Sequence, residues 1–450
     1  MPEVGVTRLA ICLAGLLMLS PAGPARSAAA EQARPTVGVL LVDHGEPPVY
    51  NEDTYESFRD FFRHLIEMGV IPSWVTALDL GTVAQDTDCF SCDAPDTDPD
   101  LMDAWLDPHP GPAPYVPASS SIPAHYVVAG GPGLGEPDIF EHVGLTVWHE
   151  WEVMGGRSPN YDQKLPKKLE VIRRLRARYG NGIPIAIGYG IDPRIGGERQ
   201  NVGVALRKLM EGGADHIVVA YHGVGFSDIM QTHMLRHEIH QTLDEIAPHV
   251  RVSYAKPIGT TRPYVKSVVK KVRAELGDLP RGAKVAIHLS GHGLPTDMCG
   301  EYDCGADAYH AFARRLFVRT KKAILADVKR PRLSVFHIYG DGASDEDDPD
   351  DEVDSPIEAL TKRKADGYRF VVDIPYEFDS DSRDTLIVLR RGYEQPEGRW
   401  NDRYESRFEW DGIKVKITNS SFGRSLKTRA YHQVIEDGLA ATKKGAHDDH

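Results

Sequence analysis

The segment Val37-Gly-Val-Leu-Leu-Val42 and the loop behind it, Asp43-His44-Gly45-Glu46-Pro47, indicate the fold most directly. A continuous apolar run without polar alternation is typical of a parallel strand covered on both faces. A helix is predicted next, over Asn51–Met68, because Tyr55, Phe58, Phe62 and Leu65 recur at helical spacing. A buried strand, a loop and an amphipathic helix in this order are the beginning of a parallel α/β unit.

The same alternation continues along the chain. Strands are predicted over Ile183–Tyr189, Ile217–Tyr221, Arg251–Ala255, Val285–Ser290, Leu333–Ile338 and Arg369–Ile374. Helices are predicted over Lys164–Tyr179, Glu198–Glu211, His233–Ile246, Pro263–Leu276, Ala306–Ala326 and Pro356–Ala365. The pattern predicts an α/β fold with parallel sheets, in which the loops at the carboxyl ends of the strands surround the binding site.

Composition excludes several classes of protein. The 450 residues are 41% hydrophobic and 26% charged, which is typical of a globular protein of two or three domains. The net charge of −14 argues against a nucleic-acid partner, because there is no excess of basic residues to replace phosphate counterions. Lys and Arg do cluster within Lys164–Arg178, but at helical spacing, and we interpret this cluster as a solvated helix face.

The first thirty residues have the pattern of a secretory signal peptide. Arg8 precedes the apolar run Leu9–Leu19, and small residues end in Ala28-Ala29-Ala30. The run is shorter than the roughly 20 apolar residues that span a bilayer, and no later stretch is long and apolar enough. We therefore predict export of the mature chain to the periplasm. At the other end of the chain, residues 441–450 are predicted to form a disordered tail.

Two segments interrupt the α/β pattern, and cysteines mark one of them. Residues 86–124 are rich in Pro, Asp and Ser and are predicted to form a surface insertion, whereas residues 340–356 contain an acidic loop. Beyond the leader, cysteines occur as two close pairs, Cys89/Cys92 and Cys299/Cys304. In an oxidising compartment we expect disulfides, with a zinc site or an iron–sulfur cluster as the less favoured alternatives.

Three histidines beside glycine follow predicted strands: His44, His222 and His292. Each alone is compatible with an ordinary loop residue, but the loops after parallel strands meet around one crevice, so three together predict a site. A helix with His233, His237 and His240 on one side is interpreted as a polar surface, since it lacks the H-E-x-x-H pattern. Residues 130–135 do not fit G-x-G-x-x-G, so no nucleotide is predicted.

Several segments, in order, make the chain resemble the ferrochelatases. Ile287–Pro295, containing Gly291-His292-Gly293-Leu294-Pro295, resembles the "SAHSLP" signature of that family, and Phe378–Leu386 resembles its "F-V-S-D-H-I-E-T-L" segment. Further similarity lies in Val37–Pro47, Met154–Pro159, Asp192–Gly213, Tyr221–Thr232 and Ile417-Thr418-Asn419 with the closing helix.

The resemblance implies a class II chelatase with two Rossmann-like lobes, over residues 31–280 and 281–440, and a tetrapyrrole cleft between them. The implied catalytic pair is His292 and Asp384, which in the family flank the macrocycle. His222 and His44 are implied as further metal ligands. The implied tetrapyrrole contacts are Gly45, Pro47, Ser158, Ser227, Leu294 and Pro295.

The residue types suit metal insertion. An imidazole can accept a pyrrole proton or pass on a metal, and a carboxylate can hold the incoming hydrated cation. The metal is then a substrate, with Fe²⁺ favoured and Co²⁺, Ni²⁺ or Zn²⁺ as other candidates. Asp384 stands where the family has glutamate, and Ser382 where it has histidine. An exported cobalt or nickel chelatase, and a non-catalytic haem- or metal-binding protein of the periplasm, are the alternatives.

Overall fold

The computed structural model describes residues 36–49, 151, 154–191, 199–225, 235–293, 306–340, 353–393 and 406–443. Outside these residues lie the expected signal peptide, the helix predicted over Asn51–Met68, the insertion, all four later cysteines, most of the acidic loop and residues 444–450 of the tail. Residues 441–443, predicted to begin a disordered tail, are instead the last residues of a helix.

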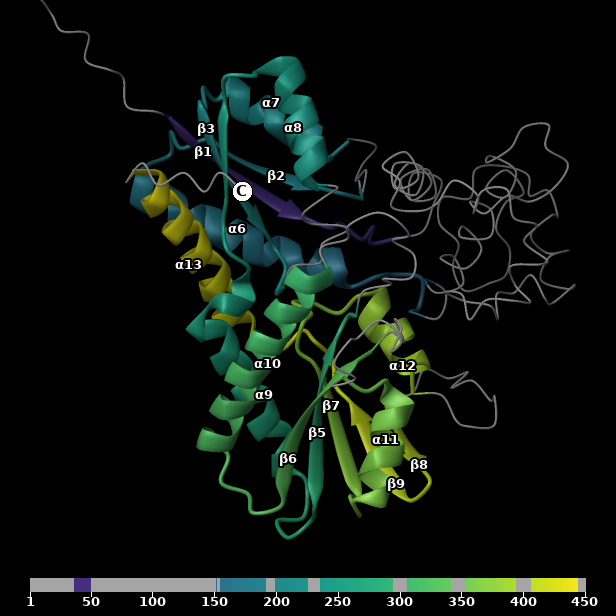
Figure 1. Ribbon diagram of the computed structural model, residues 1–450. Helices are drawn as coiled ribbons and strands as arrows, with labels where there is room; N and C mark the ends of the chain where they lie inside the picture. Colours follow the sequence, from purple (N-terminus) through teal and green to yellow (C-terminus); the bar gives the residue numbers. More distant parts are fainter. Residues whose placement is uncertain are drawn as a thin grey trace, which may run out of the picture. The chain divides into compact units, whose positions relative to one another are not determined.

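A first sheet is formed by the strands of the first half of the chain, and all its neighbours are parallel (Figure 1). Its order is β2 (Ile185–Tyr189), β1 (Val37–Asp43), β3 (His216–Tyr221) and β4 (Arg251–Tyr254). The helices connecting these strands are α6 (Asn160–Tyr179), α7 (Val202–Glu211) and α8 (Leu235–Ile246). The predicted parallel α/β architecture is confirmed here.

A second sheet follows in the chain, with four parallel strands and one antiparallel edge strand. Its order is β6 (Leu333–Tyr339), β5 (Val285–Gly291), β7 (Phe370–Pro375), β9 (Ile413–Ile417) and β8 (Arg407–Trp410). The remaining helical elements, in chain order, are η5 (Ile258–Thr260), α9 (Arg262–Gly277), α10 (Ala306–Asp327), α11 (Pro356–Ala365), η8 (Asp384–Val388), α12 (Leu389–Arg391) and α13 (Arg424–Lys443).

Strand β1 is buried on both faces, as its apolar run predicts. Val39 and Leu41 belong to an apolar cluster that continues through α9 and α13 to the second sheet, whereas Leu40 and Val42 pack on the side of α7 and α8. The last helix, α13, returns from the end of the chain to pack against α6, α9 and β3 (Figure 1). The two sheets therefore share one continuous core.

The β8–β9 hairpin is absent from the sequence prediction, although the sequence contains a signal for it. The hairpin turns at Asp411 and Gly412, which have φ of +46° and +81°. An Asp-Gly pair between strands is a strong signal for such a turn, because both central residues need positive φ. The other differences are small: α6 begins at Asn160 rather than Lys164, and α7 begins at Val202 rather than Glu198 because Asn201 caps it.

Candidate active site at the carboxyl ends of β1, β5 and β7

The site is formed where three strands end. His44 follows β1, His292 follows β5, and Asp384 comes at the end of the loop that leaves β7. His292 Nε2 lies 3.7 Å from Asp384 Oδ2, and these side chains are 41% and 28% exposed. The resemblance implies that these two residues act together, and their side chains do lie close to one another, where solvent can reach them.

The pair is in contact rather than separated by a gap the size of a ring. A planar macrocycle stacked between the two groups needs about 7 Å, which is two van der Waals contacts of roughly 3.5 Å. Because the observed separation is 3.7 Å, His292 and Asp384 form one two-ligand pair on a single side of any ring that approaches them. This arrangement differs from the flanking position that the resemblance implies.

His44 lies close enough to the pair for the charge of Asp384 to influence the pKa of its imidazole. Its Nδ1 is 2.6 Å from the Gly45 carbonyl oxygen. Burial lowers the pKa of this imidazole, and the opposing influence of Asp384 is smaller, so the ring is neutral near pH 7. Gly45 has φ of +82° and packs against the Ile191 backbone, where a Cβ would collide with the carbonyl oxygen. Only glycine fits at this point.

Asp384 is the first residue of a π-helical turn, η8, of the kind often found at functional sites. Burial alone would raise the pKa of its carboxyl, but the neighbouring His292 and Arg383 lower it well below the usual range. Arg383 NH1 is 3.6 Å from Asp384 Oδ1. The carboxylate is therefore ionised at neutral pH and can bind a cation.

Glu46 is a site residue that sequence reasoning missed. Its buried carboxyl accepts hydrogen bonds from the Ser158 hydroxyl and, at 3.1 Å, from the Arg383 backbone N–H. Burial, together with the charge of Asp384, raises its pKa to about 8. Glu46 thus carries a proton at neutral pH and fixes the residue that precedes Asp384. Its position directly after Gly45 was the available signal.

Glu377 supports His292 from behind and was also missed. It accepts a long hydrogen bond of 3.4 Å from the His292 backbone N–H and one of 2.9 Å from the Tyr309 hydroxyl. Tyr309 in turn accepts a bond from Gly293 N–H at 3.0 Å. A Cβ on Gly291 would lie 2.7 Å from the Glu377 carboxylate, so a larger residue there would displace that carboxylate. No pattern in the sequence marks Glu377.

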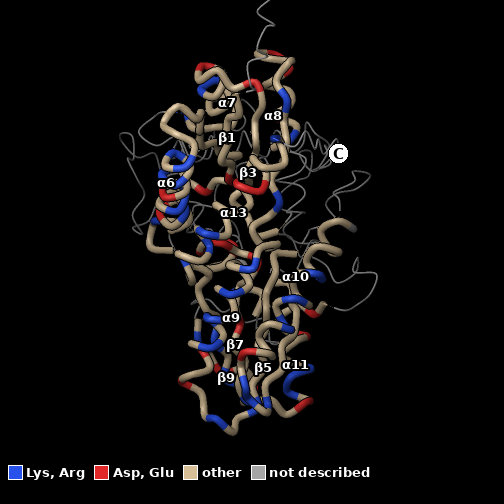
Figure 2. The backbone as a smooth tube through the Cα atoms, turned by 90° about the vertical axis from the view of Figure 1, so that its left-hand side faces the viewer, with Lys and Arg blue, Asp and Glu red and all other residues tan. Residues whose placement is uncertain are grey.

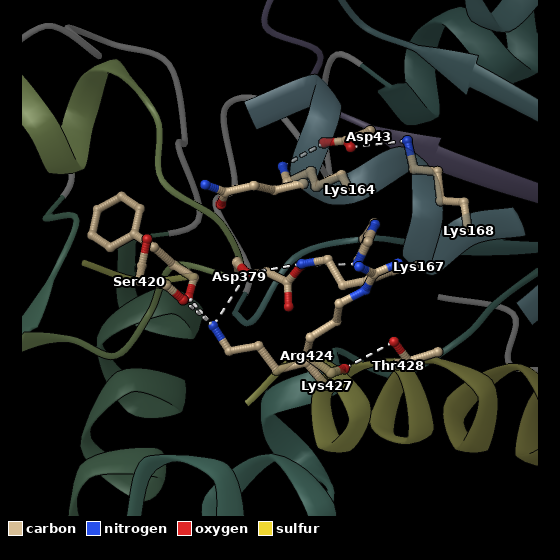
Figure 3. A network of polar contacts seen from close by, with 12 residues as sticks. Asp43, Lys164, Lys167, Lys168, Asp379, Ser420, Arg424, Lys427 and Thr428 are labelled. Atoms are coloured by element: carbon tan, nitrogen blue, oxygen red, sulfur yellow. Dashed lines mark hydrogen bonds and ion pairs between the residues drawn. The ribbon is translucent and has the colours of Figure 1, made fainter. Parts of the chain in front are cut away.

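A buried ionic network lies beside the site (Figure 3). It corrects the interpretation of the basic cluster for its three lysines, whereas Arg173, Arg176 and Arg178 are exposed as predicted. Lys164, Lys167 and Lys168 of α6 are buried rather than solvated. Asp43 binds Lys164 at 2.7 Å and Lys168 at 2.9 Å, while Lys167 pairs with Asp379. Charged side chains were taken as a sign of exposure, but two aspartates from distant strand ends make burial possible.

Lys427 of α13 completes this network. Its ammonium group donates to the backbone carbonyls of Phe378, Asp379 and Ser420, at 3.0, 3.1 and 2.6 Å. Burial lowers the pKa of Lys427 to about 7. The network therefore ties the loop after β7 to α6 and to α13, and that loop carries Asp384.

His222 belongs to the buried network and not to the His292 pair. Its Nε2 is 3.0 Å from Asp379 Oδ2, and its ring stacks on Tyr431 with centroids 4.2 Å apart. Burial lowers its pKa to about 4, so the ring is neutral. Asp381, which follows Asp379 in the same loop, accepts hydrogen bonds from Ser420 and Gln163 and is not part of the His292 pair either.

Of the predicted tetrapyrrole contacts, some lie among the described residues and the others lie outside them. Gly45 and Ser158 lie at the site, and Ser158 also links to the β1 loop by donating its N–H to the Pro48 carbonyl at 2.9 Å. The Pro47 carbonyl accepts a bond from the Trp151 indole at 3.2 Å. Ser227, Leu294 and Pro295 lie outside the described residues, as do Cys89, Cys92, Cys299 and Cys304.

Within the described ranges, no group of three or more His, Cys, Asp or Glu side chains is arranged to hold a metal ion. Among the same residues, no helix has the length and apolar character needed to cross a membrane.

Comparisons with known proteins give distant structural similarity only. No family model matches the chain, and no curated protein matches it. Among solved structures, it is similar to SirB from Bacillus subtilis with Fe³⁺, with 13% identity, a TM-score of 0.39, and coverage of 62% of this chain and 91% of that one. A second is the sirohydrochlorin chelatase SirB from Bacillus subtilis subspecies spizizenii in complex with cobalt, with 12% identity, a TM-score of 0.36, and coverage of 62% and 90%.

Proposed function

We propose that the protein inserts a divalent metal ion into a tetrapyrrole, in the manner of a ferrochelatase, with Fe²⁺ as the favoured metal and a protoporphyrin-type ring as the substrate. The observation that carries this proposal is the His292–Asp384 pair, with 3.7 Å between Nε2 and Oδ2 and both side chains partly open to solvent. The segments that contain these two residues, Ile287–Pro295 and Phe378–Leu386, resemble ferrochelatase motifs, which supports the same assignment.

The pair offers one nitrogen and one carboxylate oxygen, which is a donor set that suits Fe²⁺ and its neighbours in the first transition row. Two protein ligands leave the other coordination positions of the incoming ion to water and then to ring nitrogens. The ionised Asp384 attracts the hydrated cation, and the His292 imidazole replaces one of its waters. Metal transfer to the ring then proceeds from the side on which the pair lies.

Insertion also requires the removal of two protons from the pyrrole nitrogens. His44 is a neutral imidazole beside the pair and can accept one of them. The second proton can pass to the His292 imidazole once the metal has left it for the ring. Glu46 is protonated at neutral pH, so it does not add a second negative charge next to Asp384. The carboxylate that binds the metal thus follows β7, whereas the imidazole of His44, which takes a proton, follows β1.

The test is a metal-insertion assay. Purified protein is incubated with protoporphyrin and Fe²⁺, Co²⁺, Ni²⁺ or Zn²⁺ in turn, and the porphyrin absorption bands are followed. His292→Ala is expected to lower the rate by about 10²–10⁴, because it removes both a metal ligand and the acceptor of the second proton. His237→Ala, on the exposed face of α8, is the matched control and keeps the parental rate.

Asp384 is tested by two substitutions in the same assay. Asp384→Asn removes the charge and should eliminate insertion, whereas Asp384→Glu restores the side chain of the family and should preserve or raise the rate. A parental rate in His292→Ala or Asp384→Asn refutes the assignment of that residue. Tight haem binding without turnover for any metal indicates a binding protein, and preference for Co²⁺ or Ni²⁺ indicates a chelatase of different specificity.

A further inference from the structure

Helices α9 and α10 carry a basic surface that is unusual for this acidic chain. They pack side by side on one face of the second sheet (Figure 1). Together they contain ten Lys and Arg residues but three Asp and Glu, whereas the chain as a whole has 52 against 66. Figure 2 shows Lys and Arg positions along both helices. This surface is therefore positively charged, although the chain as a whole is negatively charged.

On α9 the apolar and basic residues occupy opposite sides. Tyr264, Val265, Val268 and Val272 are buried. The exposed side carries Arg262, Lys266, Lys270 and Arg273, at helical spacings of four, four and three residues. Glu275 of this helix is already paired, with Lys271 at 2.8 Å and with Lys416.

The exposed side of α10 combines basic and apolar residues. Val318 is 57% exposed and Leu325 is 42% exposed, which makes them two of the four exposed large hydrophobic side chains among the described residues. They are seven residues apart and so lie on the same side of the helix. Around Val318, at the positions three and four residues away in each direction, the sequence has only basic residues: Arg314, Arg315, Lys321 and Lys322.

Acidic residues do not neutralise the basic residues that surround Val318 on α10. Asp327, at the end of α10, lies half a turn away from Val318 on the helix and forms an ion pair with Arg273 of α9. Between Ala311 and Lys329, the face that contains Val318 has no Asp or Glu. Exposed apolar side chains that are surrounded by basic side chains are typical of a helix that lies on an anionic bilayer.

We propose that this α9–α10 face binds the surface of a membrane that contains anionic phospholipids. The basic side chains contact the headgroups, and Val318 and Leu325 enter the boundary between headgroups and acyl chains. A soluble polyanion such as RNA is the weaker candidate, because it gives the two exposed apolar side chains nothing to contact. The inference is independent of the proposed metal insertion, since it uses none of the site residues.

The test is co-sedimentation of the purified protein with vesicles of phosphatidylcholine alone or mixed with phosphatidylglycerol. We expect binding to the mixed vesicles only, weakening as salt is added. Arg315→Glu with Lys322→Glu should reduce binding by at least about 25-fold, since each of the two basic residues near an anionic surface contributes roughly a factor of five. The matched control is Arg207→Glu with Lys208→Glu, two exposed residues of α7, which should bind as the parent does.

A second variant separates a bilayer from a soluble polyanion. Val318→Ser with Leu325→Ser keeps every charge, and both positions are exposed, so folding is preserved and can be checked by circular dichroism. We expect it to bind the mixed vesicles more weakly than the parent. If vesicle binding is unchanged in this variant and heparin binds equally well, the face recognises polyanions in general. If Arg315→Glu with Lys322→Glu binds like the parent, the proposal is overturned.

Discussion

Asp379→Asn is expected to destabilise the protein strongly, because it removes the charge at the centre of a buried network. The Asp379 side chain is 1% exposed and pairs with Lys167, which is 4% exposed, and with His222 at 3.0 Å. Asparagine has nearly the same shape but leaves the ammonium group of Lys167 buried without its counter-charge. Breaking a buried pair in this way costs about 3–5 kcal/mol.

This loss is large against a total stability of about 5–15 kcal/mol for a folded domain. With a urea m-value of about 3 kcal/mol per molar, the unfolding midpoint should fall by about 1–2 M. The deficit should shrink as pH rises. Burial already lowers the pKa of Lys167, and without Asp379 to oppose this effect the lysine can lose its proton and with it the desolvation cost.

Urea unfolding followed by circular dichroism measures the effect, with Asp366→Asn as control. Asp366 is 54% exposed and lies 3.6 Å from Arg363, so its pair contributes at most about 1 kcal/mol. In a double-mutant cycle, adding Lys167→Met to Asp379→Asn should recover part of the loss, since no lone charge remains. A loss in Asp379→Asn no larger than in Asp366→Asn would refute the reasoning.

Two further predictions concern protonation and the cysteines. Glu46 has a pKa raised from 4.5 to about 8 in the folded protein, so it destabilises the fold progressively as pH rises through this window. Glu46→Gln removes that titration, and its unfolding free energy relative to the parent should increase between pH 4.5 and 8; a constant difference would show that Glu46 is ionised throughout. In protein produced in an oxidising compartment, where the leader is predicted to send it, titration of the unreduced, denatured chain should find essentially no free thiols at Cys89, Cys92, Cys299 and Cys304, and four reactive thiols would contradict the expected disulfides.

The fold was accessible from the sequence for a geometric reason. Apolar runs identify parallel strands, and parallel strands deliver the residues that follow them to one edge. This reasoning indicates the positions of His44 and His292, whereas Asp384 was indicated only by the resemblance of its segment to a ferrochelatase motif. His292 and Asp384 lie 3.7 Å apart. The pattern fixes which ends of the strands converge, but not the spacing of the side chains, so contact between the two groups could not be foreseen.

The buried lysines and the two glutamates were not accessible, because they depend on partners remote in the chain. Lys167 is 212 residues from Asp379, and Glu46 is 337 residues from Arg383. Helical periodicity assigns a lysine to the solvent side unless such a partner is known. Glu377 acts through the backbone N–H of His292, and hydrogen bonds of this kind leave no signature in residue type or spacing.

The long separation between the segments that build the site affects how the site forms during folding. Strand β1 and the loop after β7 come from opposite ends of the chain, yet Asp43, Glu46 and Asp379 fix them to the same neighbours. Closing so long a loop is entropically costly and slow compared with forming local helices. During refolding or synthesis, we expect helical structure to be acquired early, and the His292–Asp384 pair to be completed only after residues beyond Asp384 have emerged and docked.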